Sequence, residues 1–192
     1  MNGNEVDKAL VLRVQAGDKT AFDVLVKKYQ QKIMNLVSGY IKDHSEVMDV
    51  TQEAFIKAYR ALGKFRNDSA FYTWLYRIAI NTAKNYLVAR NRRPPNTDVD
   101  AVDAELYGIA PALQEHASPE RLMLTEEIRK IVFQVIEELP EDLRMAITLR
   151  EIEGHSYEQI GEMMECPVGT VRSRIFRARE AIDEKVKPLI NN

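Results

Sequence analysis

The chain has 192 residues, 45% of them hydrophobic and 29% charged, with a formal net charge of −2. These values indicate a soluble chain with enough apolar residues for one or two small domains, and no apolar run approaches the roughly 20 residues that cross a bilayer. The single cysteine excludes an internal disulfide, and residues 1–7 contain no basic stretch followed by an apolar one. We therefore expect no secretory signal and a reducing, cytoplasmic location.

The first half of the chain has the apolar spacing of amphipathic helices. Apolar residues recur three and four positions apart over residues 22–40, and the pattern resumes over residues 50–62. A third helix is predicted from about residue 73 to residue 90. Pro94 and Pro95 then prevent its continuation, because proline lacks an amide hydrogen and clashes with the preceding turn.

Residues 65–93 interleave aromatic and basic side chains, in the sequence FRNDSAFYTWLYRIAINTAKNYLVARNRR. Such a mixture suits an unpaired nucleic-acid strand, because each base offers a face for stacking and each phosphate a charge. The alternative is that aromatics at helical spacing form a core. Trp74 and Tyr76 point roughly 200° apart on a helix, so at least one of them is expected in the core.

Residues 92–121 have weak periodicity and many acidic side chains, and we interpret them as an acidic, flexible linker. Helices are predicted to resume over residues 122–138 and from residue 141 to about residue 151. No segment alternates at period two over strand length. The fold class is therefore all-α, with two small helical domains, residues 1–91 and 122–192, on either side of the linker.

Near the end of the chain, the sequence predicts two helices separated by a short break. Ser156 and Gln159 form a capping box at the start of the first helix. The break falls at residues 165–167, and the second helix begins at about Val168. Its apolar residues share one side, whereas the far side and flanks carry Arg172, Ser173, Arg174, Phe176 and Arg177.

This polar side suits the major groove of duplex DNA. A helix fits the groove, arginine can bond a guanine through two atoms, and Phe176 can contact a thymine methyl. The alternative is an ordinary solvated basic face on a terminal helix.

Charge is distributed unevenly, in agreement with two separate contacts. Residues 72–95 hold five basic and no acidic side chains, whereas residues 96–127 hold eight acidic and one basic. Residues 168–192 carry six basic against three acidic side chains. Because binding to phosphates depends on local patches rather than on net charge, the pattern predicts two nucleic-acid contacts that are held apart.

Two motifs carry a resemblance to the extracytoplasmic-function sigma factors of bacterial RNA polymerase, closest to the sigma-E type. SYEQIGEMMECPVGTVRSRIFRARE, residues 156–180, resembles region 4 of that family, and DVTQEAFIKAYRALGKF, residues 49–65, with the aromatic segment resembles region 2. The resemblance implies an alternative sigma factor that binds core polymerase, recognises the −35 and −10 promoter elements and nucleates opening at stress or envelope-response genes.

The resemblance also implies roles for single residues. The five residues on the polar side of the last helix, Arg172 to Arg177 without Ile175, would contact the −35 element. A pocket for a base flipped from the −10 element would be formed by Phe65, Asn67, Asp68, Ser69, Ala70, Phe71 and Asn81. Melting and backbone contact would involve Lys57, Tyr72, Trp74, Arg77 and Lys84. Asp49, Gln52 and Glu53 would face the β′ clamp helices of polymerase, the alternative being a solvated helix surface.

The implied partners are core RNA polymerase, through its β′ clamp helices and β flap, and promoter DNA as duplex and as melted non-template strand. An anti-sigma factor, often membrane-bound in the family, would hold the protein at the inner membrane. The linker would follow the polymerase RNA exit path, the alternative being an inert acidic tether.

No catalytic constellation, metal-ligand spacing or phosphate-binding glycine loop is present in the sequence, so we expect no enzyme activity, cofactor, metal or small-molecule substrate. Cys166 could be a redox sensor or a small turn residue. The competing functions are a free-standing dimeric helix-turn-helix regulator and a nucleic-acid-processing enzyme, the latter disfavoured by the missing catalytic residues.

Overall fold

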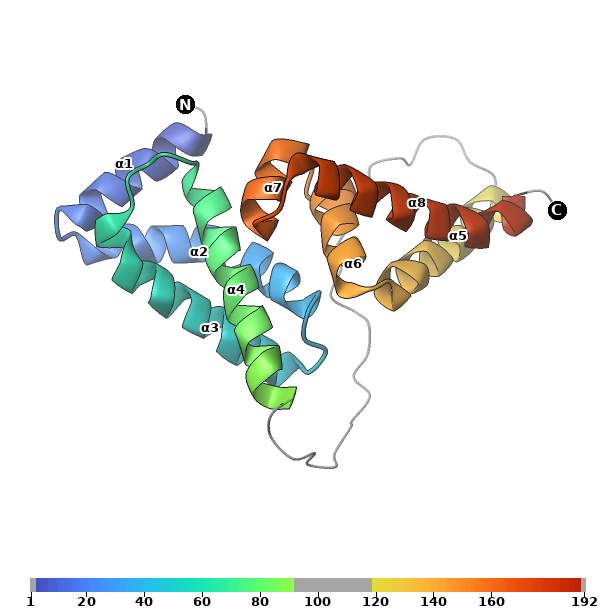
Figure 1. Ribbon diagram of the computed structural model, residues 1–192, viewed down its shortest axis with the longest axis horizontal. Coiled ribbons are helices and arrows are strands. Elements are labelled where there is room, and N and C mark those ends of the chain that lie inside the picture. The colour runs from blue at the N-terminus through green and yellow to red at the C-terminus, as the bar shows by residue number, and fades with distance from the viewer. Residues whose placement is uncertain (1–2, 92–118, 191–192) are drawn as a thin grey trace. The chain divides into compact units, whose positions relative to one another are not determined.

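The computed structural model describes residues 3–91 and 119–190 (Figure 1). Over these two ranges all regular structure is helical, which confirms the expected all-α class. The chain divides into two compact units, one built mainly on the N-terminal helices and one on the C-terminal helices. Within the described ranges, no helix has both the length and the apolarity to cross a membrane.

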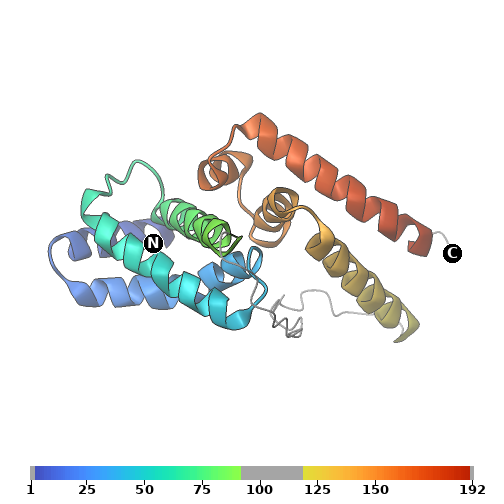
Figure 2. The same ribbon diagram turned by 60° about the horizontal axis from the view of Figure 1, so that its bottom comes forward.

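The N-terminal unit contains four α-helices and one short turn of 3-10 helix. Its elements are α1 (Gly3–Gln15), α2 (Lys19–Ser38), α3 (His44–Ala61), η1 (Leu62–Lys64) and α4 (Phe71–Asn91). Helix α1 folds back on α2, and α2, α3 and α4 pack against one another (Figures 1 and 2). The three helices predicted for this half are confirmed, whereas α1 was not predicted.

Two of these helices begin earlier than the apolar pattern indicates, because an aspartate caps each of them. Asp18 accepts a hydrogen bond from the Thr20 amide at 3.0 Å, and Asp43 accepts one from the Glu46 amide at 3.0 Å. Such caps satisfy amide groups that have no partner within the helix. The hydrogen bond from Thr20, and then the Arg13 guanidinium, lower the pKa of Asp18 to about 2.

The core of this unit follows the predicted periodicity. Leu25, Ile33 and Val37 of α2 are fully buried, as are Leu75 and Ala79 of α4. Tyr76 is 1% exposed and lies in the core, so the expectation that Trp74 or Tyr76 would be a core residue is confirmed.

The C-terminal unit is built around its last helix. Its elements are α5 (Pro119–Glu138), α6 (Glu141–Ile147), the π-helical turn η2 (Thr148–Ile152), α7 (Tyr157–Met164) and α8 (Val168–Ile190). Helix α8 runs beside α5 and also packs against α6 (Figures 1 and 2). Helix α5 begins before the predicted start at residue 122, with proline in the first turn, where its missing amide hydrogen costs nothing. The remainder of the predicted linker, residues 92–118, lies outside the described residues.

The predicted pair of helices near the C-terminus is confirmed in detail. The Ser156 amide donates to Gln159 Oε1 at 2.9 Å, and the Gln159 amide donates to Ser156 Oγ at 3.2 Å, so the capping box forms. Val171, Ile175 and Ala178 of α8 are at most 1% exposed. The apolar side of α8 is therefore the side that packs, and the arginine-bearing side faces outward.

Candidate nucleic-acid interfaces

The outward face of α8 presents four of its five predicted residues to solvent. Arg172, Ser173, Phe176 and Arg177 are all exposed. Phe176 is 61% exposed, which is unusual because large apolar side chains are generally buried in monomeric proteins. An aromatic ring between two exposed arginines forms a surface that could read base edges and thymine methyl groups.

Arg174 differs from its neighbours because its guanidinium is engaged within the unit. It pairs with the Asp142 carboxylate of α6 at 2.5 Å and donates to Cys166 Sγ at 3.3 Å. Its side chain is 20% exposed. The expectation that Arg174 contacts DNA is therefore revised: in this conformation Arg174 joins α8 to α6 and to the turn before α8.

Two contacts hold the polar side of α8 in place. The Arg172 guanidinium lies 5.9 Å from the centre of the Tyr157 ring, and the Arg150 guanidinium lies 4.9 Å from the same ring. Ser173 Oγ donates to the Thr170 carbonyl at 2.9 Å, so its oxygen can still accept a hydrogen bond. These contacts limit the rotamers of the first turns of α8 and reduce the entropy lost on binding.

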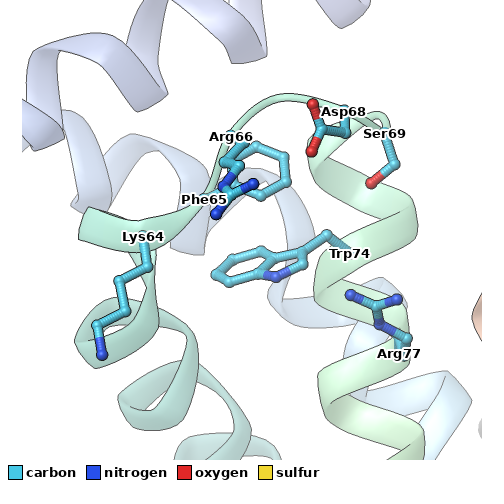
Figure 3. Close-up of a pocket in the computed structure, with 7 residues that line it drawn as sticks. All are labelled: Lys64, Phe65, Arg66, Asp68, Ser69, Trp74 and Arg77. Atoms are coloured by element: carbon cyan, nitrogen blue, oxygen red, sulfur yellow. The ribbon is translucent and has the colours of Figure 1, made fainter.

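A second candidate interface is a pocket of about 250 Å³ between η1 and α4 (Figure 3). Its lining residues are Lys64, Phe65, Arg66, Asp68, Ser69, Trp74 and Arg77. The Trp74 ring reaches from α4 across the pocket toward Lys64, Arg77 lies on the following turn, and Asp68 and Ser69 project from the loop at the end of α4. Three cations and one carboxylate give the pocket a net positive charge, which suits a nucleotide.

Aromatic rings form the wall behind this pocket. The Trp74 ring centre lies 4.8 Å from that of Phe65 and 5.8 Å from that of Phe71. Phe65 is 8% and Phe71 2% exposed. Trp74 is therefore the ring that a base could stack on, while Phe71 belongs to the core. This placement corrects the expectation that Phe71 contacts a base directly.

The predicted pocket residues are thus only partly brought together. Phe65, Asp68 and Ser69 line the pocket, and so do Trp74 and Arg77, which were predicted for melting or backbone contact. Lys64 and Arg66 were missed. The lining does not include five other residues from the prediction, which are Asn67, Ala70, Tyr72, Asn81 and Lys84. Asn67 has a φ of 58°, a left-handed conformation that asparagine tolerates better than most residues, and it reverses the chain within the loop.

A third candidate surface lies on α3. Asp49, Gln52 and Glu53 are exposed, as a contact surface requires. Glu53 pairs with Lys57 at 2.8 Å, and both side chains are close to half exposed. Met48 and Ile56, which sequence reasoning did not select, are 53% and 46% exposed. They lie one turn on either side of Gln52, so this helix presents apolar and polar side chains together, as protein interfaces often do.

Comparisons with known proteins agree with this division. A family model of Sigma-70 region 2 matches residues 25–93, and one of Sigma-70, region 4 matches residues 129–182. The pocket lies in the first matched region and α7 with most of α8 in the second. The fold and these matches define the chain as a two-domain RNA polymerase sigma factor of the sigma-70 class.

Whole-chain relatives narrow this class. The chain is 66% identical over 190 residues to the ECF RNA polymerase sigma-E factor of Escherichia coli (strain K12), covering 99% of both chains. It is also 66% identical over 186 residues to the RNA polymerase sigma-H factor of Pseudomonas aeruginosa, covering 97% of this chain and 96% of the relative. The chain therefore belongs to the ECF family of RNA polymerase sigma factors, which are transcription initiation factors, and the expected resemblance is confirmed.

Solved structures with lower identity share the fold. CnrH, solved in complex with the cytosolic domain of CnrY, is 24% identical with a TM-score of 0.66, covering 95% of this chain and 98% of that chain. The sigma factor RpoE of Bartonella quintana, solved with the anti-sigma factor NepR, is 22% identical with a TM-score of 0.65, covering 86% and 96%.

Proposed function

We propose that this sigma factor uses its two units for two different promoter contacts. Helix α8 would read the −35 duplex through Arg172, Ser173, Phe176 and Arg177. The pocket around Trp74 would take up a base unstacked from the non-template strand of the −10 element, as enzymes that act on bases do with a flipped nucleotide. Residues 1–91, 92–121 and 122–192 would serve as melting domain, linker and −35 domain.

The pocket is the observation that carries this proposal. A helix-turn-helix repressor needs only a surface for duplex DNA, whereas an initiator also has to hold a base outside the helix. The pocket offers the Trp74 ring for stacking, Lys64, Arg66 and Arg77 for phosphates, and Asp68 and Ser69 for hydrogen bonds. A base removed from the duplex requires all three kinds of contact.

Core polymerase would bind elsewhere on the protein. The α3 surface with Asp49, Gln52 and Glu53 would meet the β′ clamp helices, with the exposed Met48 and Ile56 adding apolar area. The C-terminal unit would meet the β flap. Because solved relatives of the same fold were crystallised with anti-sigma factors or with the cytosolic domain of a partner, we propose that an anti-sigma factor, membrane-bound at the inner membrane, holds this cytoplasmic protein until stress or envelope damage releases it.

The proposal makes the chain a binding factor without catalysis of its own. It would act with no cofactor, no metal and no small-molecule substrate, and polymerase would carry out the chemistry. Asn81 and Lys84, on α4 outside the pocket lining, would contact the separated strands during opening.

Run-off transcription with core polymerase tests the proposal. We expect transcripts to begin at a defined set of promoters from a genomic library, and permanganate to modify thymines around the −10 element of each. Replacing single non-template bases by abasic sites should slow opening strongly at one or two positions. An absence of promoter-specific transcripts would exclude a sigma function, and insensitivity to every abasic site would exclude base capture.

A further inference from the structure

Helix α1 touches the pocket from outside the segment that matches Sigma-70 region 2. The side-chain amide of Gln15, the last residue of α1, donates to the Leu62 carbonyl at 2.9 Å and to the Phe65 carbonyl at 2.9 Å. We infer that Gln15 is a positioning residue for base capture, acting through the backbone at Phe65. The inference rests on the proposed function of the pocket.

The two carbonyls mark the place where the chain leaves its helix. Leu62 begins η1, and Phe65 follows η1 with extended backbone, at φ −71° and ψ 121°. Carbonyls at a helix end lack partners within the helix. One primary amide has two N–H donors, so Gln15 can satisfy both carbonyls at once. This bridge fixes the direction in which Phe65 and Arg66 enter the pocket, and the Phe65 ring lies against Trp74.

Gln15 is itself held by the turn that follows it. Gly17 has a φ of 100°, a conformation that favours glycine, and its amide donates to the Val14 carbonyl at 2.9 Å. The Arg13 guanidinium pairs with Asp18 at 2.6 Å across the same turn. The end of α1 therefore has a defined position from which Gln15 reaches η1.

The other end of α1 is anchored toward the same aromatic wall. Asp7 is 1% exposed and accepts hydrogen bonds from the Tyr29 hydroxyl and from Lys28 Nζ, both at 2.5 Å. The Tyr29 ring centre lies 5.8 Å from that of Phe71, which in turn contacts Trp74. Burial, and then the bond to Asp7, raise the pKa of Tyr29, so its hydroxyl stays a donor. Helix α1 thus contacts both phenylalanines behind Trp74, through Gln15 and through Tyr29.

Three variants separate the donor from the shape of the side chain. Gln15→Glu keeps the shape but replaces the donors with a carboxylate facing two carbonyls. Gln15→Lys restores donors without the amide, because an ammonium group has three. Gln31→Glu is the matched control, since the Gln31 amide bonds only Asn35 Oδ1, at 3.0 Å on the exposed side of α2.

The measurement is the rate of promoter opening by holoenzyme, with core affinity determined in parallel. We expect Gln15→Glu to open the promoter about three- to tenfold more slowly, as the loss of one or two neutral hydrogen bonds would cause. Core affinity should not change. Gln15→Lys should recover most of the rate, and Gln31→Glu should match the parent. A normal rate for Gln15→Glu overturns the inference and leaves the pocket proposal intact.

An abasic template decides whether Gln15 acts through the pocket. On a promoter whose captured base is replaced by an abasic site, the parent protein itself opens slowly, and the Gln15→Glu penalty should disappear. An undiminished penalty on that template would show a general structural effect and overturn the inference. If no abasic position slows the parent protein, base capture fails and this inference fails with it. Should Gln15→Glu not fold, judged by circular dichroism, Gln15→Ala takes its place under the same criteria.

Discussion

Arg177 lies on the open side of α8 with no partner required to hold it in the C-terminal unit's core. Arginine that bonds a guanine through two atoms contributes about 1–3 kcal/mol of discrimination. We therefore expect Arg177→Ala to lower transcription from matched promoters by about tenfold or more and to flatten the preference at one −35 position. Transcription from a set of −35 variants would measure both effects, with core affinity unchanged.

Arg179 offers a control on the same helix. It makes an ion pair with Glu151 at 2.5 Å and is exposed, and it does not belong to the predicted reading surface. Arg179→Ala should leave the pattern of base preference as it is. If Arg177→Ala weakened core binding as much as promoter use, its assignment to the −35 element would be wrong.

Arg174, three positions before Arg177, should affect stability rather than base preference. Its pair with Asp142 is partly exposed, and such pairs contribute about 0.2–1 kcal/mol. We expect Arg174→Ala and Asp142→Ala each to lower the free energy of unfolding by about 1 kcal/mol or less, and the double variant to show a positive coupling of similar size. Urea unfolding followed by circular dichroism measures this.

The same residue supplies a stricter test. With Arg174 engaged as the structure shows, the relative use of −35 variants by Arg174→Ala should equal that of the parent protein. A change in which base is preferred would show that Arg174 leaves Asp142 to contact DNA.

At the level of single residues, the sequence predicted types of contact better than it predicted which side chains reach the surface. Phe71 and Trp74 both appear as aromatics near basic residues, yet only Trp74 lines the pocket, because Phe71 faces α2 and packs on Tyr29. Lys64 and Arg66 were missed because their part in the pocket depends on how η1 lies against α4. Local spacing does not carry that information.

Among the elements, α7 depends on the reciprocal cap at its first turn. Replacing an N-cap serine by alanine costs about 1 kcal/mol, so Ser156→Ala should lower the stability of the C-terminal unit by about that amount. Ser38→Ala is the matched control, since Ser38 Oγ donates to the Asn35 carbonyl near the end of α2. Thermal unfolding by circular dichroism compares the two. Equal losses would mean that the capping box adds no stability of its own.

The elements that the sequence predicted share a regular apolar stripe. Residues 22–40 and the last helix follow the period of 3.6 closely, and both were found near their predicted positions. Helix α1 was missed because its buried face includes Asp7. A reading based on apolar spacing treats an acidic residue there as an interruption, although hydrogen bonds from Tyr29 and Lys28 make its burial favourable. Long-range partners of this kind are visible only in the structure.

For the whole molecule, the energy of promoter opening exceeds what this chain can supply. Unstacking ten base steps costs roughly 14 kcal/mol at about 1.4 kcal/mol per step. Stacking on an aromatic ring returns about 1–3 kcal/mol per base, and the pocket contains one suitable ring, Trp74. The protein therefore depends on polymerase to hold both promoter contacts and to complete the opening.

We accordingly expect the free chain to bind promoter duplex at least about a hundredfold more weakly than holoenzyme does, since holding two sites in a fixed geometry raises affinity by about 10²–10⁴. Fluorescence anisotropy at matched salt measures both affinities, and permanganate should detect no open thymines with the free chain. Tight, polymerase-independent binding to a palindromic duplex would instead favour a dimeric helix-turn-helix regulator.

The π-helical turn η2 limits which changes in chain length this protein can tolerate. The Glu153 amide donates to the Thr148 carbonyl at 3.1 Å, five residues back, and the His155 amide donates to the Leu149 carbonyl at 3.0 Å. Deleting one residue here would let the turn relax to an ordinary α-helix and rotate all that follows by about 100°. The capping serine of α7 would then face a different direction. During evolution, insertions and deletions should therefore accumulate between the two units and avoid residues 148–155, even where point substitutions there are harmless.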